Sequence, residues 1–227
     1  MQSILGLVLA VAPLLLMAAA PASAQGAQGA VHVVTYIELQ AATTKDGVAL
    51  LKRYREGVRK ESGNLEVEMG QEIGRPNRFV LIEGWRDQSD FDAHEKADAT
   101  ARVRDALKAM QHSPSDQRVN IGFDVAAPAG PGALIVETHI DVIPPRQGAT
   151  EAALKAEAAA TRKDPGNLRW DVFQQLTPRT NHFNVLAVWR AQKDFDRYET
   201  AAHAAQFRET LAPLLGALYD ERLYKMM

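Results

Sequence analysis

The feature that most constrains the fold is an internal repeat, because the chain matches itself at a displacement of 103 to 104 residues. Residues 85–92, WRDQSDFD, return as 189–196, WRAQKDFD, and residues 59–65 return as 162–168 with Gly-Asn-Leu at the end of each. Matches that keep one register over such a stretch predict two copies of a single structural unit.

The copies are predicted to span residues 31–124 and 133–227. Residues 125–132 between them are rich in Pro, Gly and Ala and lack periodicity, which is typical of a linker. A unit of about 95 residues is small for an independent domain. We therefore expect the two copies to bury a shared face.

Each copy has the pattern strand, helix, strand, strand, helix, strand. The first strands are rich in Val, Ile and Thr, and the first helix has apolar residues at a spacing of three to four. Gly63 and Gly166 stand where the first helices should stop, and Asp90 and Asp194 stand where an N-cap begins the second helices. The expected elements of the two copies are strands 31–39 and 133–142, helices 46–61 and 148–163, strands 65–73 and 168–176, strands 79–85 and 182–189, and strands 118–125 and 217–224.

This order is a split βαβ, or ferredoxin-like, unit of the α+β class. Its helices cover one face of a four-stranded antiparallel sheet and leave the other face open. Because the second copy can cover that face with its own sheet, we predict two tandem ferredoxin-like units folded into one intramolecular α/β barrel.

Residues 1–24 have the pattern of a secretory signal peptide. Residues 4–20 form an apolar run without charge, and Ala22 and Ala24 fit the small-residue positions before a cleavage site. The run is short for a membrane span, although no Lys or Arg precedes it and an uncleaved anchor is the alternative. We expect a periplasmic or secreted protein with no membrane part after cleavage.

Charge and cysteine content exclude several kinds of partner and chemistry. The chain has 26 basic and 28 acidic residues, and this balance argues against nucleic acid as a partner. It has no cysteine, so disulfides, thiolate nucleophiles and Cys-ligated metals are excluded. Since no cluster of His, Asp and Glu has metal-ligand spacing, we expect neither a metal nor another redox cofactor.

Residues 164–174 of the second copy, DPGNLRWDVFQ, and residues 183–195 around Trp189 resemble the antibiotic biosynthesis monooxygenase domain of the dimeric α/β-barrel superfamily. The first copy resembles it less closely. Most members pair as homodimers, so the resemblance implies a pseudo-dimer within one chain. Members include oxygenases that act on quinols or polycyclic phenols without metal or flavin, haem-degrading relatives, and proteins of no known activity.

Trp85 and Trp189 lie at the position of the family's pocket-lining Trp, at the end of the third strand of each copy. An indole there can stack on an aromatic substrate, and a core Trp is the alternative. The phenol-oxidising relatives hold the substrate with an Asn before this Trp and a Tyr after it. Both copies have apolar residues at these positions, with Leu81 and Val185 in place of the Asn and Phe91 and Phe195 in place of the Tyr.

Family members often carry two His five residues apart on the second helical segment. The first copy keeps His94 of this pair, whereas the second copy has Tyr198 there and keeps His203. His139, on the first strand of the second copy, is expected to point into the same space. Because imidazole is the usual proton acceptor near neutral pH, we assign His203 or His139 as the base and Tyr198 as the residue that orients it.

The favoured hypothesis is a cofactor-independent monooxygenase that acts on a small aromatic such as a quinol, with the second copy as the working site. Substrate contacts are expected from Trp189, Trp85, Phe195 and His94. The alternative is a non-catalytic periplasmic binding or stress-response module for small apolar molecules, which the missing Asn and Tyr favour. Haem degradation ranks third, because both copies have Arg where an axial His is needed.

Overall fold

The computed structural model describes residues 29–125, 132–176 and 178–227. The predicted signal peptide and most of the predicted linker lie outside these ranges. The elements of the first copy are β1 (Val31–Glu38), η1 (Ala41–Thr43), α2 (Thr44–Val58), β2 (Asn64–Glu72), β3 (Arg78–Trp85), α3 (Gln88–Lys96), α4 (Asp98–Lys108) and β4 (Asp116–Asp124). Those of the second copy are β5 (Leu134–Asp141), η2 (Pro144–Arg146), α5 (Gln147–Thr161), β6 (Asn167–Gln175), β7 (His182–Trp189), α6 (Gln192–Glu199), α7 (Ala202–Leu211), η3 (Ala212–Leu214) and β8 (Asp220–Met226).

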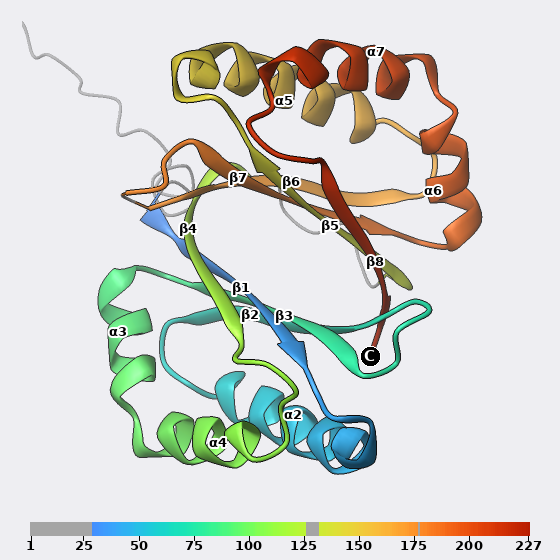
Figure 1. Ribbon diagram of the computed structural model, residues 1–227. Helices are drawn as coiled ribbons and strands as arrows, with labels where there is room; N and C mark the ends of the chain where they lie inside the picture. The colour runs from blue at the N-terminus through green and yellow to red at the C-terminus, as the bar shows by residue number, and fades with distance from the viewer. Residues whose placement is uncertain (1–28, 126–131, 177) are drawn as a thin grey trace, which may run out of the picture.

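Within the described ranges the strands close into one barrel, in the order β1-β3-β2-β8-β5-β7-β6-β4. The copies join where residues 70–72 of β2 pair with 224–226 of β8, and where residues 120–124 of β4 pair with 172–175 of β6. Figure 1 shows the two sheets stacked on each other, with the helices of each copy on the outer sides. The predicted fold, two tandem ferredoxin-like units in one intramolecular barrel, is therefore confirmed.

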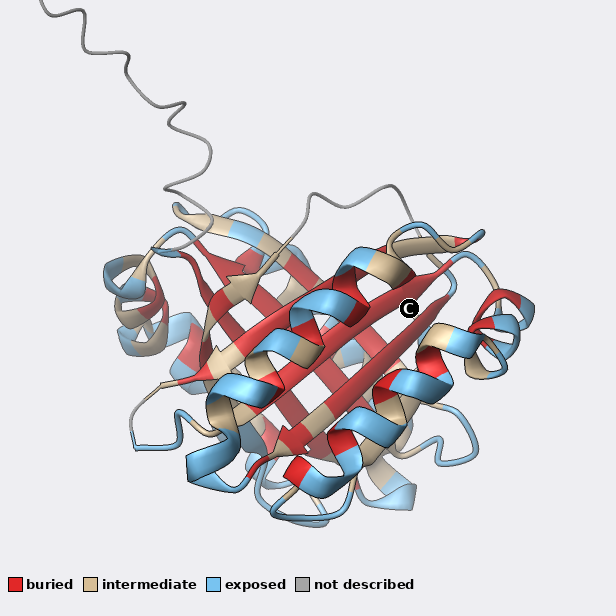
Figure 2. Ribbon diagram, turned by 90° about the horizontal axis from the view of Figure 1, so that it is seen from above, coloured by how far each residue is buried: buried red, intermediate tan, exposed pale blue. Residues whose placement is uncertain are grey.

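Side chains alternate between the two faces of each strand. In β3, Leu81 and Trp85 pack under the helices of the first copy, whereas Val80 and Ile82 pack inside the barrel. The helices are amphipathic, and Figure 2 shows their buried residues on the side toward the strands. The described residues thus form one core under each helical layer and a third inside the barrel. None of the helices in this part of the chain is long and apolar enough to cross a membrane.

Gly63 and Gly166 stand in the turns that follow the first helix of each copy, as predicted. Their φ angles are 83° and 89°, a left-handed conformation that favours glycine because it has no Cβ. A Cβ at either position would also collide with the side chain of Asp90 or Asp194. The turn and the start of the second helical segment are therefore packed against each other in both copies.

The second helix of each copy differs from the prediction at its start and in its middle. Asp87, not Asp90, is the N-cap of α3, and its side chain accepts a hydrogen bond of 3.0 Å from the backbone N–H of Asp90. In the second copy Ala191 occupies the N-cap position, so Asp194 lies in the first turn. Each predicted helix is also two short helices, because Ala97 and Ala201 have extended backbone between them.

Candidate functional site

A cavity of about 280 Å³ lies under the helical layer of the first copy. Its walls come from β1, β3, α2, α4 and the segment 111–117. The apolar lining residues are Ile37, Leu51, Leu81, Val103, Leu107 and Pro114, and the polar ones are Thr35, Tyr54, Glu83, Arg104, Lys108, Gln111, Ser115 and Gln117. Apolar walls with a few polar groups are typical of a small-molecule site.

Glu83 brings a carboxyl group to this cavity from the sheet. It follows Leu81 in the alternating series of β3, so its side chain faces the helices, and the residue is only 1 % exposed. Burial raises the pKa of Glu83 above its usual value, although Tyr54 and His94 act in the opposite direction. A carboxyl group with a raised pKa beside an apolar cavity is suited to accept and return a proton.

Glu83 begins a chain of hydrogen bonds that leads away from the cavity. The Tyr54 hydroxyl lies 2.7 Å from Oε1 of Glu83 and 2.9 Å from Nε2 of His94. Nδ1 of His94 lies 2.8 Å from Oε2 of Glu61, whose side chain is 31 % exposed. Burial and the nearby Glu83 carboxylate raise the pKa of Tyr54 far above its usual value. The phenol therefore stays neutral, and its single hydroxyl both donates and accepts.

Trp85 supports His94 and does not line the cavity. The two ring centroids are 4.6 Å apart, with the planes tilted by 30°, and Trp85 is completely buried. Phe91 packs on the same indole at 6.4 Å. Of the residues predicted in the first copy, the structure thus brings Trp85 and His94 together behind the cavity wall. His94 is connected to that wall by its hydrogen bond with Tyr54.

The equivalent space of the second copy contains larger side chains. Phe207 takes the position of Val103, and Trp170 adds an indole to the same core. Both are buried, at 5 % and 3 % exposure. Ala187 takes the position of Glu83, so the carboxyl group is missing as well. Aromatic side chains therefore occupy part of the equivalent space in the second copy, and the carboxyl group that β3 brings to the cavity of the first copy has no counterpart on β7.

Trp189, Phe195 and Tyr198 lie together in this aromatic core. The Tyr198 ring centroid is 5.3 Å from that of Trp189 and 5.9 Å from that of Phe195. All three residues are at most 4 % exposed. Burial raises the pKa of Tyr198 far above its usual value, so its hydroxyl stays protonated. The structure brings these three predicted residues together in close packing.

His203 lies between two carboxyl groups at the edge of the second copy. Its Nδ1 is 3.1 Å from Oε1 of Glu157, and its Nε2 is 3.1 Å from Oδ2 of Asp164. Glu157 and Asp164 are the equivalents of Tyr54 and Glu61 in the repeat. An imidazole therefore bridges the same two positions in both copies, although it comes from α3 in the first copy and from α7 in the second.

His139 does not share a space with His203, contrary to the expectation. Ile140, its neighbour on β5, packs under the helices, so His139 is on the opposite face of the strand and points toward the barrel interior. Its Nε2 lies 3.1 Å from Nδ1 of His182. Burial and the nearby Arg118 lower the pKa of His139 to about 4. The sheet therefore separates a neutral His139 from the other predicted site residues.

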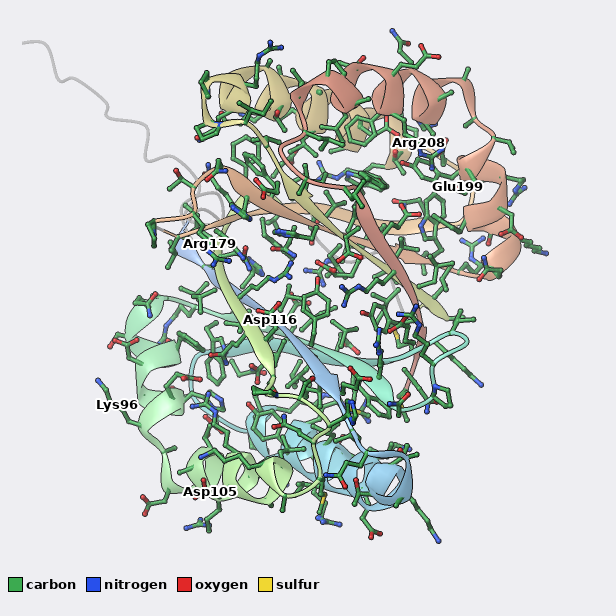
Figure 3. The ribbon with its side chains drawn as sticks, viewed as in Figure 1. Lys96, Asp105, Asp116, Arg179, Glu199 and Arg208 are labelled. Atoms are coloured by element: carbon green, nitrogen blue, oxygen red, sulfur yellow. The ribbon has the colours of Figure 1, made fainter. Side chains whose placement is uncertain are left out.

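Arg104 and Arg208, at the positions where haem-degrading relatives need an axial His, are ion-paired. Arg104 pairs with Glu95 beside the cavity, and Arg208 pairs with Glu199. Figure 3 labels this second pair beside α6 and α7. Across the described ranges no group of three or more His, Asp and Glu side chains is placed to hold a metal.

Glu83, Tyr54 and Glu61 are not among the site residues predicted from the sequence. Glu83 does carry a signal, because it is a charged residue in the buried, period-two series of a predicted strand. Tyr54 fits the apolar spacing of the predicted helix, and Glu61 is an ordinary helix-end charge. Only the packing of α2 against β3 and α3 brings these residues to one site.

A sequence profile of the family described as antibiotic biosynthesis monooxygenase matches residues 30–106 and 133–210. The two matches correspond to the two copies, and the first includes Tyr54, Glu61, Glu83 and His94. No curated protein matches the chain.

Several solved structures share the fold over nearly the whole chain. A candidate monooxygenase from Lactobacillus acidophilus has 11 % identity and a TM-score of 0.73, covering 87 % of this chain and 94 % of that one. A second, from Fusobacterium nucleatum, has 13 % identity and a TM-score of 0.77, covering 87 % and 92 %. An anthrone oxidase-like protein has 12 % identity and a TM-score of 0.70, covering 88 % and 92 %. At such identities the likeness establishes a common fold.

Proposed function

The chain belongs to the antibiotic biosynthesis monooxygenase family, and on that premise we propose that it is a monooxygenase that oxidises a small phenolic aromatic, such as a quinol, in the cavity of the first copy. The observation that supports this location is the buried carboxyl group of Glu83 in the wall of an apolar cavity. The names of the three structural neighbours, two candidate monooxygenases and an anthrone oxidase-like protein, agree with the reaction class.

The size of the cavity supports a substrate of one or two rings. A cavity of about 150 Å³ in another protein binds benzene, and the cavity here is about 280 Å³. Leu51, Leu81 and Leu107 offer apolar contact to a flat ring. A ring buried there leaves its hydroxyl to be met by Glu83 or Tyr54, since a buried hydroxyl needs a hydrogen-bond partner.

The reaction proposed needs no electron donor besides the substrate. A quinol and dioxygen give a hydroxyquinone and water, so that one oxygen atom enters the ring, the other leaves as water, and the ring supplies four electrons. The protein excludes solvent, holds the ring and removes the phenol proton. Deprotonation raises the electron density of the ring that meets dioxygen, and Glu83 is the proposed base.

A second location and a second function are each favoured by one observation. In the second copy, His203 lies between two carboxyl groups and beside Tyr198, which are the surroundings of a base. This copy is therefore the second candidate for the working site. Leu81, at the position of the family's substrate-binding Asn, favours instead a module that binds small apolar molecules without chemistry. We also propose, from residues 1–24 alone, that the protein is exported.

The experiment is oxygen uptake by the purified protein with a panel of quinols and naphthols, with and without a chelator. We expect uptake that the chelator leaves unchanged, and a loss of about 10²-fold in Glu83→Gln. The matched controls are His203→Gln, which tests the second copy, and Glu137→Gln, which removes a buried carboxyl group inside the barrel. Ligand binding without oxygen uptake would instead support the binding module.

A further inference from the structure

We infer that Glu83, Tyr54 and His94 act as one unit that takes the proton of the phenol, keeps it inside the protein and returns it to the oxygen that leaves as water. The inference rests on the proposed function, because the proton comes from a phenol bound in the cavity of the first copy. It assigns positioning roles to Tyr54 and His94, which act on the substrate through Glu83.

The hydrogen-bond geometry allows two proton arrangements in this unit. The Tyr54 hydroxyl has one hydrogen and two partners, Oε1 of Glu83 at 2.7 Å and Nε2 of His94 at 2.9 Å. In the first arrangement a protonated Glu83 donates to Tyr54, and Tyr54 donates to a neutral His94. In the second, Tyr54 donates to an ionised Glu83 and accepts from Nε2–H of a positively charged His94. The two differ only by the shift of one proton from Glu83 to His94.

Glu61 and Trp85 favour the second arrangement. The Glu61 carboxylate, 2.8 Å from Nδ1 of His94, accepts the Nδ1–H bond and adds a negative charge beside the ring. Trp85 lies against the imidazole at a centroid distance of 4.6 Å, where an aromatic ring stabilises a cation. His94 Nε2 is also 3.9 Å from Oε1 of Glu83, so the two opposite charges attract each other directly. In the second arrangement the charge on His94 thus favours the ionised form of the buried Glu83.

The proton balance of the reaction fits a unit that stores a proton. Glu83 takes the proton as the phenol O–H bond breaks, and the phenolate ring carbon forms a C–O bond with dioxygen. Glu83 then returns the proton to the outer oxygen of the peroxide formed in this way. When the O–O bond breaks, the same ring carbon loses its hydrogen as a proton. The outer oxygen takes this proton and leaves as water. No proton is gained from or lost to solvent over the cycle.

Titratable and charged groups reach Glu83 from each of the helices packed near it. Tyr54 comes from α2 and His94 from α3, while Arg104 of α4 and Glu95 of α3 are paired with each other at the cavity wall. Because the Arg104 charge is already neutralised, the His94 ring is the cation that most directly affects Glu83. Removal of the Tyr54 hydroxyl, which links Glu83 to His94, should therefore make Glu83 harder to ionise.

The first test uses 4-nitrophenol, whose phenolate is coloured, and a pH indicator in weak buffer. We expect phenolate to form on the wild-type protein with no proton released, and at least about tenfold less phenolate on Glu83→Gln. Release of one proton for each phenolate formed would overturn proton storage and leave the proposed function intact. If no phenolate forms on the wild-type protein, Glu83 is not a base, and both proposals fail.

The second test is the pH dependence of oxygen uptake in Tyr54→Phe and His94→Gln. The matched control is Tyr36→Phe, which removes a hydroxyl that donates to Glu137 inside the barrel. We expect the rise of the rate to move to higher pH by about one unit or more in the first two variants, with the rate regained at high pH, and no movement in the control. A rate lowered equally at every pH in Tyr54→Phe and His94→Gln, with both proteins folded by circular dichroism, would show that these residues are only structural.

Discussion

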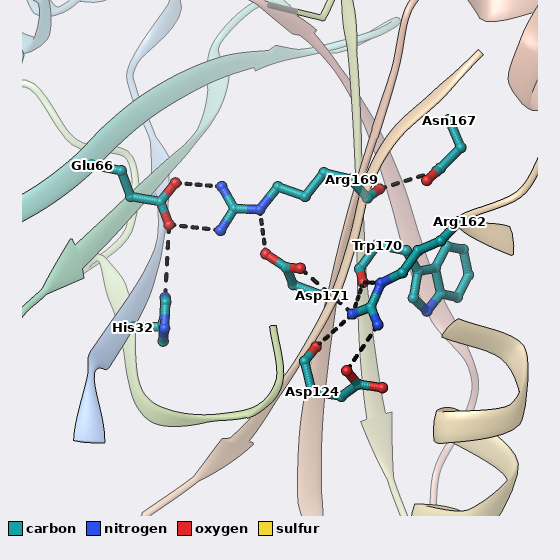
Figure 4. Close-up of polar contacts among 8 residues, drawn as sticks. All are labelled: His32, Glu66, Asp124, Arg162, Asn167, Arg169, Trp170 and Asp171. Atoms are coloured by element: carbon teal, nitrogen blue, oxygen red, sulfur yellow. Dashed lines mark hydrogen bonds and ion pairs between the residues drawn. The ribbon is translucent and has the colours of Figure 1, made fainter. Parts of the chain in front are cut away.

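Glu66 and Arg169 occupy equivalent positions of the two copies and form a two-bond ion pair with each other across the barrel (Figure 4). Nη2 of Arg169 lies 2.7 Å from Oε1 of Glu66. Arg169 also pairs with Asp171, and His32 lies 3.7 Å from Glu66 on the other side. Two identical copies would place two glutamates or two arginines here, so the opposite charges favour the pairing of unlike copies.

We expect the copies to prefer each other when they are made as separate chains. Residues 29–125 and 132–227 mixed in equal amounts should give a one-to-one complex, because each homodimer brings like charges together at this buried position. Native mass spectrometry measures the populations. Homodimers as abundant as the mixed complex would show that the ion pair does not select the partner.

Removal of Arg169 is expected to destabilise the whole protein. Arg169→Met leaves Glu66 in a largely buried place without its cation, a change that costs about 3–5 kcal/mol of the free energy of unfolding. Urea unfolding measures this value. A cost below about 1 kcal/mol, which is typical of exposed pairs, would show that solvent replaces the lost partner.

The free energy of unfolding at acid pH should depend on the ion pair between Glu66 and Arg169. Burial alone would raise the pKa of Glu66, but hydrogen bonds from Arg169 and the nearby His32 ring lower it to about 2. Because the folded protein binds this proton more weakly than the unfolded chain does, the stabilisation is complete above about pH 4 and is lost as the pH falls toward 2. Arg169→Met should flatten this part of the stability curve, measured by urea unfolding between pH 2 and 6.

The fold could be predicted from the sequence because its causes are local and repeated. The 103-residue displacement, the alternating strands and Gly63 and Gly166 each limit the backbone without knowledge of distant contacts. The start of the second helix could not be predicted from Asp90, since Asp87 three residues earlier is an equally good cap and packing decides between them.

The candidate site could be predicted only in part, because its geometry depends on volume and on partners distant in sequence. His94 and Trp85 are found from the sequence, but the carboxyl groups that give His94 its surroundings are 11 and 33 residues away. The preference for the second copy rests on its closer resemblance to the family. The difference between Val103 in the first copy and Phe207 in the second alters the space under the helices, but it changes no recognisable sequence motif.

Glu137, inside the barrel, should make stability fall as the pH rises toward neutral. Burial raises the pKa of Glu137 to about 7, although hydrogen bonds from Tyr36 and Asn184 act in the opposite direction. The folded protein therefore binds this proton more tightly than the unfolded chain, and stability decreases between about pH 4.5 and 7. Glu137→Gln should remove this slope, measured by urea unfolding at pH 5 to 8. An unchanged slope would assign it to other groups.

The two lone histidines should differ in their importance for stability. His94 is fully buried with hydrogen bonds on both ring nitrogens, so His94→Ala should cost about 1–3 kcal/mol. His203 has 29 % of its side chain exposed, and His203→Ala should cost under about 1 kcal/mol. Trp189→Ala is the reference for a large core loss, at about 3–5 kcal/mol. Equal costs for the two histidines, measured by thermal or urea unfolding, would contradict this order.

Exchanging the side chains at Val103 and Phe207 should exchange the properties of the two copies. Val103→Phe places a phenyl ring in the cavity wall, where it occupies the space for a substrate, and we expect binding of 4-nitrophenol to weaken at least about tenfold while stability changes by less than about 1.5 kcal/mol. The matched variant Phe207→Val removes a buried ring from the second copy and should cost about 1–3 kcal/mol. The space it opens lacks an equivalent of Glu83, because Ala187 stands at that position. Phe207→Val should therefore bind a second aromatic ring in the second copy, as calorimetry can show. Undiminished binding by Val103→Phe would place the ligand outside the cavity of the first copy.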